Sequence, residues 1–325
     1  MLLSRFLIFL VVFASSAASA RKHKTTSSTS TSSTHAALKT SSTTSVKSTS
    51  STHSTLKTTT STTSTSSPIS TSTTTATTTT PLTPHGTVIL PLYISPIPSA
   101  WDPLYTTLAA NPELKFQLVV NPANGPGAAG TYPDSDYLAN IPLLRTYPNT
   151  IPLCYVDTSY TTRPITDVLT DIQTCQSWTT YTEADIHMSG VFFDEAVATY
   201  SPAAFAYMSN ITNYARSIFG PGNDTIVFNP GTVVPSQWYT LADYIVAYED
   251  TYADYSSSVI TSIAAAQIPQ SLFILYSFTG DAAAQQTLVD SIIGAGINSL
   301  FITTVDGYTA WSALMPQFCS AMDLT

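Results

Sequence analysis

Eight short apolar segments recur along the chain after Gly86, and they limit its possible folds more than any other feature. Each is apolar at consecutive positions, without the polar alternation of a half-exposed strand, which is typical of parallel strands buried on both faces. Segments with helical periodicity separate them, so the pattern predicts one α/β domain, a single (β/α)8 TIM barrel. An open doubly wound sheet is the alternative, but no GxGxxG turn follows the first strand. The expected strands are Val88–Ile94, Phe116–Asn121, Ile151–Val156, Gly190–Asp194, Thr225–Asn229, Tyr244–Glu249, Ser271–Phe278 and Ser299–Thr303.

The segment Ser201–Phe219 carries the signals of both ends of an α-helix. Ser201 is a suitable N-cap, Pro202 falls at the first helical position, and Gly220 follows where a C-terminal cap is expected. The helical period predicts one buried stripe, formed by Phe205, Met208, Tyr214, Ala215 and Ile218.

The first 85 residues differ from the rest. Residues 1–20 resemble a secretory signal peptide, with Arg5, a short apolar core and a small-residue cleavage site ending at Ala20. A signal anchor is the alternative, because basic residues follow directly. Residues 21–85 are almost pure Ser/Thr, so we expect a disordered, O-glycosylated linker before a barrel domain at 86–325. The chain is therefore expected to be secreted or associated with the cell wall or cell surface.

Charge separates the same two regions. From Gly86 onward there are twenty Asp and Glu against four Lys and Arg, a formal net charge of −16. Such a domain repels nucleic acid and anionic membranes and attracts a polycation, although many secreted domains are acidic only for solubility. His187 is the one histidine well inside this region, so we expect no metal site. We also expect no cofactor and a monomeric protein.

The three cysteines predict one disulfide and one free thiol in an oxidising compartment. Cys154 with Cys175 is the local choice, and pairings with Cys319 stay open. Two N-glycosylation sequons, at Asn210 and Asn223, fit a secreted protein.

Carboxylates follow two of the apolar strands, where the active site of a TIM barrel lies. Asp194 and Glu195 end the fourth strand, and Glu249 ends the sixth. Side chains from these strands can converge across the barrel mouth, and carboxylates about 5 to 9 Å apart are what glycoside hydrolysis needs. A helix N-terminus that favours acids, or a glutamate bonded to backbone, is the competing interpretation. Neither a GxSxG elbow nor a P-loop is present, and His187 precedes strand four, at the wrong end for a triad base.

Aromatic and amide side chains crowd the same strand ends, as in a carbohydrate cleft. Taken singly, each tyrosine or tryptophan is more often a packing residue. As a set at the strand ends, the expected substrate-binding residues are Tyr93, Asn121, Tyr155, Asn229 and Tyr248.

Seven short motifs occur in an order that resembles the spherulin-four family. They include Pro91–Ile94 with Ala100–Leu104, Val120–Pro122 leading to Gly125–Gly127, and Tyr155–Thr158 with Tyr160 and Arg163. The others are the Trp178 position, Gly190–Glu195, Asn229–Gly231 and Glu249. One departure is Cys154, where the family usually has glycine. The family is similar to glycoside hydrolase family 135, which implies a TIM barrel, hydrolysis of galactosaminogalactan at α-1,4-linked N-acetylgalactosamine, and acidic site residues at Asp194, Glu195 and Glu249.

Three functional hypotheses follow. In the first, the chain is an endo-acting glycoside hydrolase of an amino-sugar polysaccharide, a cationic polymer being compatible with its charge. Glu249 would be the general acid and Asp194 the nucleophile or stabiliser, with Glu195 orienting it or binding substrate, and a retaining outcome is favoured. In the second, it is a non-catalytic, lectin-like protein of a cell wall or spore coat. In the third, it is an adhesin dominated by the Ser/Thr region.

Overall fold

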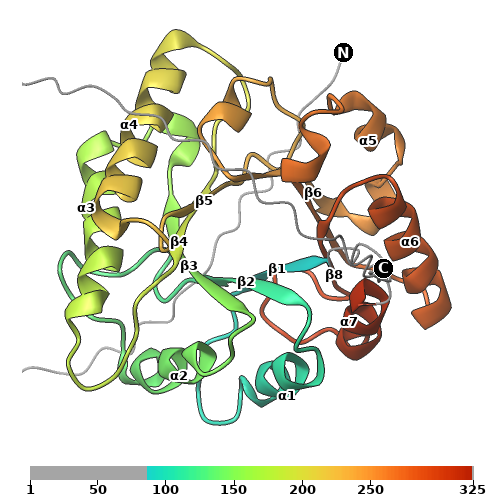
Figure 1. Ribbon diagram of the computed structural model, residues 1–325, viewed down its shortest axis with the longest axis horizontal. Coiled ribbons are helices and arrows are strands. Elements are labelled where there is room, and N and C mark those ends of the chain that lie inside the picture. The colour runs from blue at the N-terminus through green and yellow to red at the C-terminus, as the bar shows by residue number, and fades with distance from the viewer. Residues whose placement is uncertain (1–85, 324–325) are drawn as a thin grey trace, which may run out of the picture. The chain divides into compact units, whose positions relative to one another are not determined.

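The computed structural model describes residues 86–323, which form a closed barrel of eight parallel strands in sequence order. Thr87 pairs with Ser299 to join the first strand to the last (Figure 1). The TIM-barrel prediction is confirmed, and the predicted signal peptide and linker lie outside the described residues. The strands are β1 (Thr87–Leu92), β2 (Lys115–Val120), β3 (Thr150–Asp157), β4 (Gly190–Asp194), β5 (Thr225–Phe228), β6 (Tyr244–Thr251), β7 (Ser271–Tyr276) and β8 (Ser299–Ile302).

The strands are buried on both faces, as their continuous apolar character predicts. Phe192 and Phe193 are consecutive in β4 and point to opposite sides, yet they are 1% and 0% exposed. One side chain therefore packs inside the barrel and the other against the helical layer. The predicted span of β4 agrees with the structure, and the other strands differ from prediction by one or two residues at their ends.

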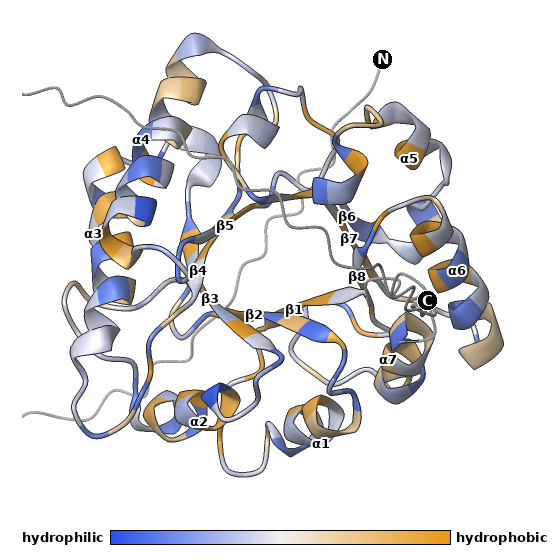
Figure 2. Ribbon diagram, viewed as in Figure 1, coloured by the Kyte–Doolittle hydropathy of each residue, from blue (hydrophilic) through white to orange (hydrophobic). Residues whose placement is uncertain are grey.

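Helices surround the strands (Figure 1), and hydrophobic residues concentrate on the strands while the helices carry both kinds of residue (Figure 2). None of the helices in residues 86–323 is long and apolar enough to cross a membrane. The α-helices are α1 (Asp102–Ala110), α2 (Ser135–Arg145), α3 (Ile165–Ser177), α4 (Pro202–Phe219), α5 (Ser258–Ser262), α6 (Ala282–Gly294) and α7 (Met315–Asp323). The 3-10 turns are η1 (Ser159–Thr161), η2 (Trp178–Thr180), η3 (Trp238–Thr240), η4 (Tyr252–Asp254) and η5 (Ile268–Gln270).

Helix α4 has the predicted ends. The Ser201 side chain accepts a hydrogen bond from the Ala204 N–H, and Gly220 ends the helix with φ 73°. The predicted stripe is only partly correct: Met208 and Ala215 are buried, whereas Phe205, Tyr214 and Ile218 are half-buried. Ala204, Ile211 and Thr212 complete the buried face instead.

The prediction of a helix after every strand is wrong between β5 and β6, where the described residues contain only η3. Pro230 and Pro235 lie in this connection. Because proline has no backbone N–H, the connection lacks two of the donors that a helix would use. Trp238, which is 1% exposed, covers this part of the barrel and packs against Phe205 of α4 with ring centroids 5.9 Å apart.

A disulfide joins Cys154 of β3 to Cys175 of α3, and Cys319 is free and buried. The local pairing is therefore confirmed.

Close packing explains the glycine that begins β4: a Cβ on Gly190 would lie 2.0 Å from the Thr225 carbonyl oxygen of β5. Only glycine allows β4 and β5 to approach so closely at this point.

Candidate active site

Two carboxylates from different strands meet at the carboxyl-terminal end of the barrel, and one amide group joins them. Asp194 ends β4, Glu249 lies near the end of β6, and Asn229 follows β5 between them. Asn229 Nδ2 donates hydrogen bonds of 2.8 Å to Asp194 Oδ1 and 2.6 Å to Glu249 Oε2. The two oxygens are therefore at most about 5.4 Å apart, the sum of these two distances.

The orientation of the Asn229 amide is fixed by its surroundings. Its Oδ1 atom accepts a 3.0 Å hydrogen bond from the Gly231 N–H, so the amide nitrogen faces the carboxylates. The side chain is buried. Asn229 was predicted to bind substrate, and the structure places it as the bridge between the two acids.

Burial raises the pKa of both carboxyl groups. For Glu249, burial and the negative charge of Asp194 raise the pKa to about 7, while hydrogen bonds from Tyr308 and Asn229 favour the ionised form. Burial also raises the pKa of Asp194, opposed by hydrogen bonds from the Tyr155 hydroxyl, the Glu195 backbone N–H and the Asn229 amide. Glu249 can therefore hold a proton near neutral pH while three donors stabilise an ionised Asp194, the division of roles that acid/base catalysis requires.

Three tyrosines surround the pair. The ring of Tyr93, which follows β1, meets the rings of Tyr155 and Tyr308 edge-on, with centroids 5.8 Å apart in both cases. The Tyr308 hydroxyl donates a 2.6 Å hydrogen bond to Glu249 Oε1, and the Tyr155 hydroxyl is hydrogen-bonded to Asp194. The predicted residues Tyr93 and Tyr155 are thus brought together with the acids.

Tyr308 was missed by the sequence analysis. It lies after β8 in the turn Asp306-Gly307-Tyr308, far along the chain from the motifs that carry carboxylates. Its backbone has φ 56°, and Gly307 before it has φ 73°. An Asp-Gly turn directly after the eighth strand was the available signal, because every strand of the barrel ends at the same mouth.

The side chain of Glu195 does not share the hydrogen-bond partners of Asp194. It is exposed, its backbone has φ 47°, and its side chain is hydrogen-bonded to Asp157 at the end of β3. Burial, followed by the charges of Asp157 and Asp194, raises the pKa of Glu195. The sequence left open which of the adjacent acids joins Glu249, and the geometry assigns Asp194 to that pair.

Two predicted binding residues are not brought to the carboxylate pair. Tyr248 packs against Tyr255 and Phe273, with centroids 5.5 and 5.7 Å away, and is 8% exposed. Asn121 closes its own loop, because its Oδ1 atom accepts a 2.8 Å hydrogen bond from the Gly125 N–H.

A β-bulge precedes Tyr248 and Glu249 in β6 and sets which face of the strand each of them occupies. The pairing of β6 with β7 shifts between Val246 and Tyr248, so one extra residue stands in β6 before the acid. A bulge changes which face each later side chain occupies and often lies next to an active site. Counting alternate positions from the start of β6 therefore cannot give the direction of Glu249.

All four tryptophans serve packing, which was the simpler interpretation of each. Their indole N–H groups each donate to a backbone carbonyl: Trp101 to Ile94, Trp178 to Thr131, Trp238 to Ala198 and Trp311 to Ala100. They hold segments that follow the strands in place, so tyrosines supply the aromatic surface around the acids.

The arginine side chains of the barrel form ion pairs with other acids, and Arg163 also donates a 2.9 Å hydrogen bond to the Asp157 backbone carbonyl. Arg163 pairs with Asp171 at 2.7 Å, Arg216 with Asp243 at 3.0 Å, and Arg145 with Asp185 at 3.6 Å. Between residues 86 and 323, no salt bridge reaches Asp157, Asp194, Glu195, Glu249 or Asp250. Within the same range no group of three or more His, Cys, Asp or Glu side chains is placed to hold a metal ion. The mouth is therefore strongly negative.

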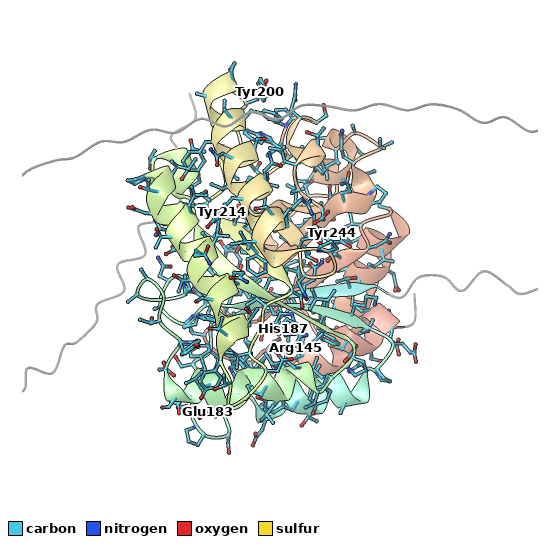
Figure 3. All side chains as sticks on the ribbon, turned by 60° about the vertical axis from the view of Figure 1, so that its left-hand side comes forward. Arg145, Glu183, His187, Tyr200, Tyr214 and Tyr244 are labelled. Atoms are coloured by element: carbon cyan, nitrogen blue, oxygen red, sulfur yellow. A yellow bond between two sulfur atoms is a disulfide. The ribbon has the colours of Figure 1, made fainter. Side chains whose placement is uncertain are left out.

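His187 lies at the opposite end of the barrel, as its position before β4 predicts. It contacts Arg145, and its Nδ1 atom donates a 2.5 Å hydrogen bond to the Asp185 carboxylate; Figure 3 shows His187 and Arg145 side by side. A cavity of about 240 Å³ is lined here by Asp185, His187 and Met188 among others. It contains none of the carboxylates of the mouth.

The family model of spherulation-specific family 4 matches residues 87–322, nearly the whole described region. Spherulin-4 of Physarum polycephalum is 30% identical over 202 residues, which are 60% of this chain and 54% of that protein. The chain thus spans about half the length of this curated relative.

Two solved structures share the barrel. The crystal structure of Aspergillus clavatus Sph3 in complex with GalNAc is 30% identical, with a TM-score of 0.70, and the match covers 74% of this chain and 98% of that one. A chitinase from Bacteroides thetaiotaomicron is 11% identical with a TM-score of 0.50, covering 74% and 96%, and that likeness shows the fold alone. The resemblance to spherulin-four proteins, a family similar to glycoside hydrolase family 135, is confirmed. The chain belongs to spherulation-specific family 4.

Proposed function

We propose that this chain is an endo-acting glycoside hydrolase that cleaves a polysaccharide containing N-acetylgalactosamine or galactosamine. The observation that carries the proposal is the pair of Asp194 and Glu249, held by the shared Asn229 amide at the mouth of the barrel. Two half-buried carboxyl groups with raised pKa values, one of them about 7, fit the division of labour in glycoside hydrolysis.

In the proposed reaction Glu249 donates its proton to the glycosidic oxygen as the bond to the anomeric carbon breaks. The ionised Asp194 attacks that carbon and forms a glycosyl ester. Glu249, now a carboxylate, then takes a proton from water, whose oxygen displaces Asp194 and releases the sugar. The two oxygens bonded to Asn229 are at most about 5.4 Å apart, which supports this retaining sequence, because retaining enzymes place their carboxyl groups closer together (about 5 to 5.5 Å) than inverting enzymes do (about 6.5 to 9.5 Å).

The substrate class is supported by charge and by family. The mouth carries carboxylates with no arginine or lysine paired to them among the described residues, which favours a polymer with free amines. Sph3, the similar structure, was crystallised in complex with GalNAc. Together these observations favour a partly deacetylated N-acetylgalactosamine polymer.

We also propose that the chain acts outside the cell, after secretion or at the cell surface. The Cys154–Cys175 disulfide supports this location, because disulfides persist in oxidising compartments.

The test is release of reducing ends from a partly deacetylated, α-1,4-linked N-acetylgalactosamine polymer by the whole chain, produced in a eukaryotic secretory host. Glu249→Gln and Asp194→Asn are each expected to lower turnover by about a hundredfold or more. Glu183→Gln is the matched control, because Glu183 is exposed and lies away from the pair. Wild-type protein that retains the polymer without cleaving it would support the lectin-like alternative instead.

A further inference from the structure

The turn that follows β3 has an unusual backbone. Ser159, Tyr160 and Thr161 have φ values of 43°, 54° and 68°, three consecutive residues in the left-handed region without a glycine. L-residues normally visit this region singly, and a β-branched residue such as Thr161 is an outlier there. Strain of this kind persists only where the surrounding structure enforces it, and it concentrates at functional sites.

Hydrogen bonds tie this turn to the backbone of the acids that end β4. The Tyr160 N–H donates a 2.7 Å bond to the Glu195 carbonyl. The Thr158 hydroxyl donates to the carbonyls of Asp194 and Glu195, at 3.0 and 2.9 Å. Ser159 donates from its N–H and its hydroxyl to Asp157, at 2.7 and 2.8 Å. The position of Tyr160 is therefore fixed relative to the acids.

This strained turn exposes the aromatic side chain that it fixes. Tyr160 is 54% exposed, more than the exposed tyrosines Tyr132 and Tyr200, at 40% and 41%. Among the described residues its ring stacks on no other aromatic ring, whereas the tyrosines around Glu249 pack on one another. An exposed ring on a strained backbone adds nothing evident to the stability of the fold.

The backbone of Tyr160 is held at the acids by its N–H bond to the Glu195 carbonyl, and its side chain responds to their charge. Its pKa is raised by burial first and then by the negative charges of Glu195, Asp194, Asp157 and Glu249. Carboxylates from β3, β4 and β6 therefore all act on this one side chain, in agreement with the backbone hydrogen bonds that hold the turn at the mouth.

We propose that Tyr160 is a substrate-contacting residue whose ring covers the apolar face of one pyranose unit of the polymer, at a subsite next to Asp194 and Glu249. The inference rests on the proposed function and adds a residue that determines which sugar unit is held. Pyranose rings present C–H faces that aromatic rings cover, and a ring fixed before binding loses little entropy on contact. The neighbouring Glu195 and Asp157 can accept hydrogen bonds from hydroxyl or amino groups of the same unit.

The experiment compares Tyr160→Ala, Tyr160→Phe and Tyr160→Gly in the whole chain on the N-acetylgalactosamine polymer. Tyr160→Ala should lower kcat/KM by about ten- to thirtyfold, mainly through KM, because a central aromatic contact is lost. Tyr160→Phe keeps the ring and should stay within about threefold of wild type. Tyr132→Ala is the matched control, because Tyr132 is similarly exposed but bonds Thr180 beyond the end of α3.

Thermal melting separates a binding role from a structural one. Tyr160→Gly removes the side chain and relieves one left-handed residue, so its melting temperature should equal or exceed that of wild type while binding weakens. A lower melting temperature with KM unchanged would overturn the inference, as would an unchanged KM in Tyr160→Ala.

Affinity electrophoresis in the same polymer keeps the two proposals distinguishable. If wild type retains the polymer without cleaving it, and Tyr160→Ala alone loses retention, the hydrolase proposal fails and this inference stands. If wild type cleaves and Tyr160→Ala cleaves equally well, only this inference fails. Wild type that neither cleaves nor binds the polymer overturns both.

Discussion

Replacing Asn229 by aspartate tests the carboxylate pair at its centre. The substitution keeps the shape of the side chain and an oxygen that can accept from the Gly231 N–H. It replaces the donor that bonds Asp194 at 2.8 Å and Glu249 at 2.6 Å by a third acidic group. Each hydrogen bond to a charged group contributes about 1.5 to 3 kcal/mol, so losing both removes roughly 3 to 6 kcal/mol of favourable interaction.

The expected kinetic effect follows from that range. At about 1.4 kcal/mol per factor of ten, kcat/KM should fall by roughly a hundredfold to ten-thousandfold. The pH profile should move as well. Glu249 acts as a proton donor, so wild-type activity should fall as the pH rises through about 7. In Asn229→Asp a donor to each ionised acid is lost and negative charge is added, so both pKa values rise and both limbs of the profile shift to higher pH.

The assay is reducing-end release across pH 4 to about 9, with circular dichroism to confirm folding. Asn213→Asp is the control, because it adds the same charge at an exposed position of α4. A folded Asn229→Asp protein that keeps kcat/KM within tenfold of wild type, with an unshifted profile, would refute the role assigned to the bridge.

Two further predictions concern single contacts. Tyr308→Phe removes the 2.6 Å hydrogen bond to Glu249 and should lower kcat by about ten- to a hundredfold. The alkaline limb of the pH profile should move to higher pH, because the ionised form of Glu249 loses a hydrogen-bond donor. An alkaline limb that does not move would argue against a role for this contact. Replacing both Cys154 and Cys175 by alanine should lower the free energy of unfolding by about 3 kcal/mol in urea titrations, since the disulfide closes a loop of 21 residues. A loss below about 1 kcal/mol would contradict the loop-closure argument.

The barrel could be predicted from the sequence because its strands are apolar on both faces and must be buried on both. Runs such as Gly190–Asp194 and Ser271–Phe278 are apolar at consecutive positions, so they must be covered on both faces, and a parallel barrel surrounded by helices does this. The same reasoning located Asp194, because an acid directly after a buried strand stands at the mouth. The ends of α4 followed from Ser201 and Gly220, whose effects are local.

The missing helix after β5 shows where local reasoning fails. Its place is covered by Trp238 packing on Phe205 of the preceding helix. That contact depends on where α4 lies in the folded barrel, so the residues between β5 and β6 do not reveal it.

The sequence by itself determined the fold and the acids at the ends of its strands, since both depend on burial patterns within short segments. Only the tertiary structure decided which groups meet. The bulge before Tyr248 turns Glu249 toward Asp194, and barrel closure brings Tyr308 from beyond β8 to within 2.6 Å of Glu249. Asn229 became the bridge because β5 lies between the strands that carry the two acids. These pairings join residues far apart in the chain, and no periodicity within a segment encodes a distance across the barrel mouth.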